Sequence, residues 1–206
     1  MTGPLLSILT VGNRSEVGLL ASPGEDVRSM FAEGLKGQDA RLPALAEDLL
    51  SETGLRFDDL GRITVCIGPG SFTGVRVGVA YARGLALALD VPCIGVTSLM
   101  ACVEPTKTTE RVRVALVAKK RPPDQTAWTQ VIDTGGPLGP AEEWRFDAFE
   151  AGAMNLVGDV PFAMASVRPN AENIANWGAR LSPQQHPPKP AYVRVPDAKL
   201  PGGKAP

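Results

Sequence analysis

The stretch from Ile63 to Leu89 constrains the fold more than any other part of the chain. Its first five residues, Ile63–Ile67, form an apolar run of strand length. Gly-Pro-Gly then interrupts the run, because glycine admits positive φ while proline fixes φ and lacks an N–H donor. Ser71 or Thr73 can cap a helix of small and apolar residues that extends to Leu89. The stretch therefore predicts a buried strand, a glycine turn and a helix.

This turn has two interpretations. The N–H groups at the helix N-terminus can hold a phosphate, in which case Gly70, Ser71 and Thr73 are the candidate contacts. However, the turn lacks the Gly-Lys-Ser/Thr ending of a P-loop and does not match G-x-G-x-x-G. The same residues can equally form a structural turn that starts the helix.

The rest of the chain alternates between strand and helix patterns, which indicates an α/β architecture. The segment Pro105–Arg111 has no apolar side chain other than the proline ring, so it predicts a boundary between one lobe at 1–104 and a smaller one at 105–206. The tail from Ser182 is rich in proline and glycine and is expected to be extended or disordered. Strands are predicted at 5–11, 17–21, 27–31, 63–67, 93–96, 112–118, 126–132 and 161–165, and helices at 38–52, 73–89, from 99, at 142–151 and at 170–181.

Composition narrows the range of functions. A formal net charge of −1 argues against broad, unaided binding of nucleic acid. The three cysteines show no CxxC pairing, so we expect core thiols in a reducing cytoplasm and neither disulfides nor zinc. No signal peptide is expected, and the helix after Gly74 is expected to be too short for a membrane span.

Catalytic arrangements are also not apparent. Ser71 is not in a G-x-S-x-G elbow, and the single histidine, His186, lies in a proline-rich segment far along the chain. The acidic residues offer no pattern for a metal site, because Asp58–Asp59 and Glu142–Glu143 are adjacent pairs whose side chains point apart. We therefore expect no catalytic residues and no metal.

Several segments resemble one known family. GPGSFTGVRVGVAYARGLALALDVPCIGVTSLMA (Gly68–Ala101) resembles the TsaB family, also called YeaZ, whose members have GPGSFTG, a small-residue helix and an IPxxGVSSLEA-like segment. Leu5–Leu20 and Gln38–Leu50 lie where the family has its first hairpin and first helix, and Ala191–Gly202 is similar to its C-terminal ending.

This resemblance implies an actin/Hsp70-like (ASKHA) fold of two α/β lobes, the second reduced. It also implies a non-catalytic, scaffolding role in making threonylcarbamoyladenosine in tRNA. The implied partners are a TsaD-like catalytic subunit, a TsaE-like ATPase and, in their absence, a second copy of the chain. ATP would be used by the complex and not by this chain, tRNA would be met only through the complex, and no membrane would be involved.

The sequence departs from the family in three places. Leu9 stands where the family has an aspartate in its first strand, and Gln38 stands near its helix-opening histidine. Val117–Trp128 replaces a DARRGEVY-like segment. Leucine cannot organise a metal and a phosphate, so a nucleotide site of the kind found in relatives of this fold is in doubt. These departures also support a further hypothesis, a homologue that no longer serves the tRNA pathway.

The two predicted helices carry the functional hypothesis. Small residues recur every four positions at Gly74, Gly78, Ala82 and Ala86, while Arg76 and Arg83 share a face. The helix can be a core helix with one solvated arginine stripe, or it can also pack against a partner. On the second hypothesis, acidic residues of the first helix are candidate partners for the arginines. The predicted interface residues are Leu42, Leu45, Leu49, Val75, Arg76, Val79 and Arg83.

A hypothesis from a different class is an enzyme that binds ATP or another phosphate ligand in the cleft between the lobes, at Ser71 and Thr73. Titration with ATP and Mg²⁺ distinguishes the two hypotheses.

Overall fold

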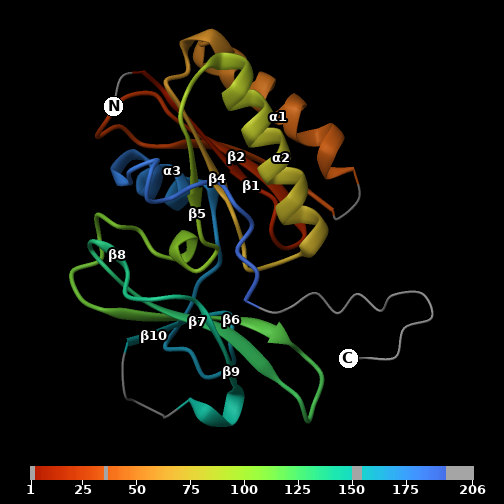
Figure 1. Ribbon diagram of the computed structural model, residues 1–206, viewed down its shortest axis with the longest axis vertical. Helices are drawn as coiled ribbons and strands as arrows, with labels where there is room; N and C mark the ends of the chain where they lie inside the picture. The colour runs from red at the N-terminus through yellow and green to blue at the C-terminus, as the bar shows by residue number, and fades with distance from the viewer. Residues whose placement is uncertain (1–2, 35–36, 150–154, 194–206) are drawn as a thin grey trace.

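The chain folds into two stacked parts, each built on a β-sheet (Figure 1). The computed structural model describes residues 3–34, 37–149 and 155–193. Three helices accompany the first sheet, whereas the second sheet has only a short 3₁₀ turn beside it, η3 (Phe146–Ala148), within the described residues. The predicted α/β class with two lobes, the second reduced, is confirmed.

The first sheet has five strands in the order β3-β2-β1-β4-β5. Strand β2 runs antiparallel to both of its neighbours, β1 and β3, and its pairing with β1 is the predicted hairpin. Strands β4 and β5 run parallel to β1. Parallel neighbours need crossover connections, and helices α1 and α2 supply them. The strands are β1 (Leu5–Leu9), β2 (Arg14–Leu20), β3 (Arg28–Glu33), β4 (Arg62–Cys66) and β5 (Cys93–Val96).

Helices cover both faces of this sheet. Two of them, α1 (Gln38–Thr53) and α2 (Phe72–Leu89), lie side by side, and α3 (Ala171–Arg180) lies on the opposite face (Figure 1). Hydrogen bonds from the first strand mark the two faces, because the Ser7 hydroxyl donates to the carbonyl of Ala171 in α3 (2.7 Å) and the Thr10 hydroxyl donates to that of Gly74 in α2 (2.7 Å).

The second sheet has the order β11-β10-β6-β7-β8, with β9 also paired to β7. The predicted antiparallel pair is confirmed as β6 and β7. The strands are β6 (Val112–Lys119), β7 (Thr126–Asp133), β8 (Gly136–Pro137), β9 (Glu142–Arg145), β10 (Asn155–Gly158) and β11 (Ala165–Ser166).

Three predictions of local structure are wrong. The helix expected at 142–151 is strand β9 followed by η3, because Trp144 lies on β9 and its ring packs against Phe149 (5.3 Å between centroids). Residues 150 and 151 lie outside the described part. The helix expected from Leu99 is only a 3₁₀ turn, η2 (Met100–Cys102), and of the strand expected at 161–165 only Ala165 pairs, in β11.

After β11 the chain returns to the first sheet. Trp177 of α3 is buried, and its indole N–H donates to the carbonyls of Met100 (3.0 Å) and Val103 (2.9 Å). The largest core cluster also contains residues of both sheets, among them Val65 and Val114. The division at 104/105 stays a prediction, but α3 belongs with the first sheet by its packing.

The prediction that this helix is too short to span a membrane is wrong for α2. At 18 residues it is long and apolar enough, by length and composition alone, to cross a membrane. Its stripe of Gly74, Gly78, Ala82 and Ala86 is buried, and α2 packs on β4. The helix therefore has the packing of a helix that covers a sheet, and a single helix of this composition is weak evidence for a span.

The small residues let α2 approach the sheet closely. A Cβ added at Gly78 would lie 2.3 Å from the Thr10 hydroxyl oxygen, whereas a Cβ added at Gly84 would meet nothing within 4 Å. The stripe is thus a requirement of helix-to-sheet packing.

The two glycines make a matched test. We expect Gly78→Ala to lower the free energy of unfolding by about 1–3 kcal/mol, because the methyl group must displace Thr10. Gly84→Ala should raise it by about 0.5–1 kcal/mol, since alanine is the better helix former. Urea unfolding of the isolated chain measures both, and equal stability of the two variants would contradict this packing.

Candidate partner interface and glycine turn

The glycine turn is tied to the loop after β5. Gly68 has φ of +90°, and its carbonyl accepts a hydrogen bond from Ser98 N–H (2.9 Å), while the Ser98 hydroxyl donates to the Pro69 carbonyl (2.5 Å). Ser71 is the N-cap of α2, as predicted, and its hydroxyl accepts from Gly74 N–H (3.3 Å). These bonds fix the angle at which α2 leaves the sheet.

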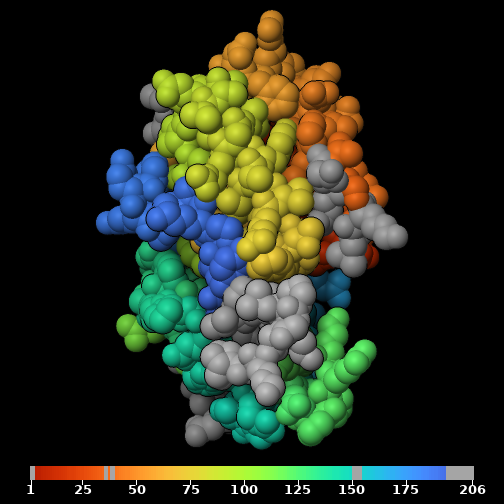
Figure 2. Space-filling model, turned by 45° about the vertical axis from the view of Figure 1, so that its right-hand side comes forward, coloured from red at the N-terminus to blue at the C-terminus, as the bar shows by residue number. Residues whose placement is uncertain are grey.

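The C-terminal segment covers this turn. Gly95 N–H donates to the His186 carbonyl (2.9 Å), and Ala191 N–H donates to the Ile67 carbonyl (2.8 Å). Figure 2 shows this segment, in blue, beside the yellow N-terminal end of α2. His186 thus contributes a backbone contact, and partial burial lowers the pKa of its ring. The expected extended tail begins with a turn at 182–186, where the Gln185 and His186 N–H groups donate to the Ser182 carbonyl, and it forms no helix or strand from there to residue 193. The PDAK segment lies outside the described residues.

Three side chains anchor the segment on α2. The Arg76 guanidinium carbon lies 3.7 Å from the centre of the Phe72 ring, and Arg76 Nε donates to the Tyr192 hydroxyl (2.9 Å). The Phe72 and Tyr192 rings lie 5.6 Å apart. Arg76, which the sequence assigned to a partner interface, is therefore engaged with the chain's own tail.

The predicted phosphate contacts stay a prediction. Gly70 packs against Val11, Ser71 is occupied in capping, and Thr73 is exposed on the first turn of α2. Among the described residues, no group of three or more His, Cys, Asp or Glu side chains is arranged to hold a metal ion. Burial also raises the pKa of the Cys66 thiol to about 12 and that of Cys93 to about 11, which disfavours thiolates at neutral pH.

An acid does lie near the position of the missing aspartate, although the sequence did not single it out. Leu9 is buried on β1 and pairs across the hairpin with Glu16. The Glu16 carboxylate is 2.6 Å from the Arg14 guanidinium and accepts a hydrogen bond from the backbone of Ala171 at the start of α3. It is 4% exposed, and burial raises its pKa in spite of both contacts. Its surroundings give Glu16 a structural role in joining the hairpin to α3.

The predicted interface residues divide into two groups. Four of the apolar ones are at most 4% exposed and pack in the core of this chain: Leu42, Leu49, Val75 and Val79. Their contact with a partner stays a prediction. Helical periodicity found the face that packs on the sheet. Leu45 is half-buried, and Arg76 and Arg83 are exposed.

The outward face of α2 presents different residues. Leu87 is 84% exposed, the largest value among the bulky apolar side chains of the described residues. Ala80 and Gly84 are also exposed, as is Ala44 on the neighbouring α1. We call Ala44, Ala80, Gly84 and Leu87 the outward patch. Arg83 is exposed within one turn of both Ala80 and Leu87, so this face of α2 combines apolar surface with a positive charge. Exposed apolar surface of this kind is typical of protein–protein contacts.

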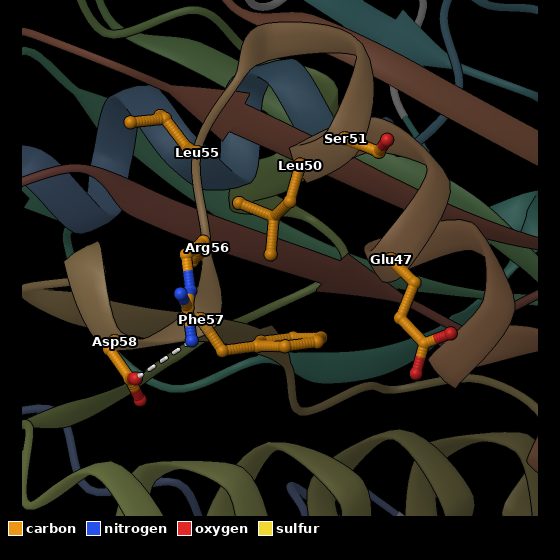
Figure 3. A pocket seen from close by; sticks show the side chains of 7 residues that line it. All are labelled: Glu47, Leu50, Ser51, Leu55, Arg56, Phe57 and Asp58. Atoms are coloured by element: carbon orange, nitrogen blue, oxygen red, sulfur yellow. Dashed lines mark ion pairs between the residues drawn. The ribbon is translucent and has the colours of Figure 1, made fainter.

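A pocket opens next to the outward patch, between α1 and the segment that follows it (Figure 3). Its volume is about 470 Å³. Figure 3 shows the Phe57 ring between the Glu47 and Asp58 side chains, with Leu50 above the ring. The pocket is lined by Glu47, Leu50, Ser51, Leu55, Arg56, Phe57 and Asp58.

The chain is similar to proteins that are named for tRNA modification. The family model for TsaD, tRNA N6-adenosine threonylcarbamoyltransferase, matches residues 36–119. Escherichia coli TsaB, a tRNA threonylcarbamoyladenosine biosynthesis protein, is 41% identical over 64 residues, which are 31% of this chain and 28% of that protein. An uncharacterised protein of Mycobacterium tuberculosis is 31% identical over 160 residues, which are 73% of this chain and 72% of the relative.

A solved structure shows the same fold over nearly the whole chain. YeaZ from Pseudomonas aeruginosa superposes with a TM-score of 0.71 at 24% identity, covering 92% of this chain and 99% of that one. The molecule is therefore a two-lobe α/β protein with the fold of YeaZ and a covered glycine turn. The chain belongs to the TsaB/YeaZ family.

The tail anchor leads to a test of stability. We expect Tyr192→Ala to lower the free energy of unfolding by about 1 kcal/mol, because it removes both the ring contact and the hydrogen bond to Arg76. Tyr192→Phe keeps the ring and should lose about half as much. Chemical denaturation distinguishes them, and a Tyr192→Ala variant as stable as the parent would show that the anchor contributes nothing.

Glu16 gives a dependence on pH. Its folded pKa lies above the unfolded value, so between the two the unfolded chain binds fewer protons, and stability falls as pH rises through that window. Glu16→Gln should remove this part of the fall above about pH 4.5. Urea unfolding between pH 4 and 7 measures it, with Glu25→Gln as the control for one lost exposed charge; the same pH slope in both variants would contradict the prediction.

Proposed function

We propose that the chain is a non-catalytic accessory subunit in the formation of threonylcarbamoyladenosine in tRNA. In this proposal it pairs with a TsaD-like catalytic subunit through the outward faces of α1 and α2. The ATP chemistry belongs to that subunit and to a TsaE-like ATPase in the cytoplasm, and tRNA is met through the complex. Family membership supports the pathway, since several relatives carry the name tRNA threonylcarbamoyladenosine biosynthesis protein.

The observation that carries the pairing is the exposure of Leu87. A leucine side chain that is 84% exposed leaves apolar surface in water, and burying it against a partner contributes roughly 1.5–3 kcal/mol. Ala80 and Gly84 precede it on the same face and permit close approach of another helix. Self-pairing through the same patch is expected when the TsaD-like subunit is absent.

The covered turn supports a scaffold over an enzyme. The rings of Phe72 and Tyr192 pack together beside the first turn of α2. The Ala191 N–H donates a hydrogen bond to the carbonyl of Ile67, the residue after β4. The Ser71 hydroxyl is itself engaged in capping α2, while Thr73 is exposed. Titration calorimetry with ATP and Mg²⁺ tests the alternative, and binding that is lost in a Ser71→Ala, Thr73→Ala variant would favour the enzyme.

The pairing is tested with charges on the outward patch. We expect Ala80→Glu combined with Leu87→Glu to raise the dissociation constant for a TsaD-like subunit at least about 30-fold, the effect of losing an interface hot spot. Co-purification with that subunit should be lost accordingly. Val79 is unsuitable for this test because its side chain is buried, and a glutamate there would disturb folding.

Met164→Glu is the matched control, since Met164 is 75% exposed on the second lobe. It should leave co-purification unchanged, and far-UV circular dichroism should show all variants folded. Undiminished complex formation by the double variant would contradict the proposal.

A further inference from the structure

The pocket between α1 and the following segment combines an apolar floor with a polar rim. Leu50 is 2% exposed, and Leu55 and Phe57 are half-buried, so the floor is made of aliphatic and aromatic carbon. Glu47, Arg56 and Asp58 stand at the rim with exposed side chains (Figure 3). A floor and rim of this kind suit a side chain that is apolar along its length and polar at its end.

The charges at the rim are unequally satisfied. The Asp58 carboxylate lies 3.8 Å from the Arg56 guanidinium, and the two side chains are 78% and 82% exposed. This ion pair therefore contributes little to stability. Glu47 forms no ion pair with any of the described residues. The three rim charges therefore sum to −1, with Glu47 left to interact with an incoming cation.

The pocket is continuous with the proposed partner surface. Glu47 follows Ala44 by one turn of α1, and its carboxylate lies close enough to Tyr81 of α2 to help raise the pKa of that phenol, after the larger effect of burial, to about 12. A subunit seated on the outward patch would thus extend over the opening.

We infer that this pocket receives a lysine or arginine side chain from the subunit that docks on α1 and α2. The aliphatic stem of the basic side chain would lie on Leu55 and Phe57, and its charged end would pair with Glu47. This inference rests on the proposed function and adds the chemistry of the contact. An apolar side chain in the pocket would leave Glu47 without a role.

Charge variants of Glu47 test the inference in the full-length chain with the TsaD-like subunit. We expect Glu47→Gln to raise the dissociation constant about tenfold and Glu47→Lys to raise it further, because the basic side chain then meets no charge or a like charge. The effect of Glu47→Gln should shrink between 50 mM and 300 mM salt, since salt screens exposed pairs.

Glu52→Gln and Glu52→Lys are matched controls, because Glu52 is exposed on the same helix but does not line the pocket. We expect both variants to have dissociation constants within about twofold of the parent, because an exposed charge outside the contact contributes little to binding. Parent-like binding by both Glu47 variants would overturn the inference and leave the proposed function standing. No binding by the parent chain would overturn the proposed function itself.

Discussion

The close approach of α2 to the sheet is the constraint on which the rest of the structure depends. It is possible because Gly74, Gly78, Ala82 and Ala86 present almost no side-chain volume to the sheet. At its centre the Thr10 hydroxyl bonds to the Gly74 carbonyl, in the space that a side chain at Gly78 would fill. The glycine turn and the Ser71 cap set the direction of the helix, and the Ser98 bonds hold that turn in place.

Packing by one face leaves the other face of α2 free. It exposes the small Ala80 and Gly84 together with Leu87 and Arg83. Helix α1 lies alongside with Ala44 and with Glu47, which forms no ion pair with the described residues. The chain thus has a helix pair whose outer surface exposes a leucine beside small residues and an arginine, with an acidic pocket next to it. At the N-terminal end of α2, by contrast, Tyr192 and Arg76 are joined, so the turn is committed to contacts within the chain.

Local patterns in the sequence were sufficient for most of the fold. Apolar residues at helical spacing predicted all three α-helices, and the apolar runs predicted the strands of the first sheet and the β6–β7 pair. The predicted helix at 142–151 failed because Glu142–Arg145 pairs with β7, a long-range partner that periodicity does not reveal.

The candidate site was less predictable for a physical reason. Helical spacing identifies an apolar face, but it does not tell whether a sheet or a partner covers it. In this chain the core covers Leu42, Leu49, Val75 and Val79. Leu87 carried no signal beyond its apolarity. The contact between Arg76 and Tyr192 joins residues 116 positions apart and follows only from the tertiary fold.

The central claim is that this chain serves the formation of threonylcarbamoyladenosine in tRNA. The most direct measurement is the content of that nucleoside in tRNA from cells depleted of the chain, determined by mass spectrometry of digested tRNA. The account predicts that the modified nucleoside falls on depletion and returns when the chain is supplied again. An unchanged content in fully depleted cells would contradict it.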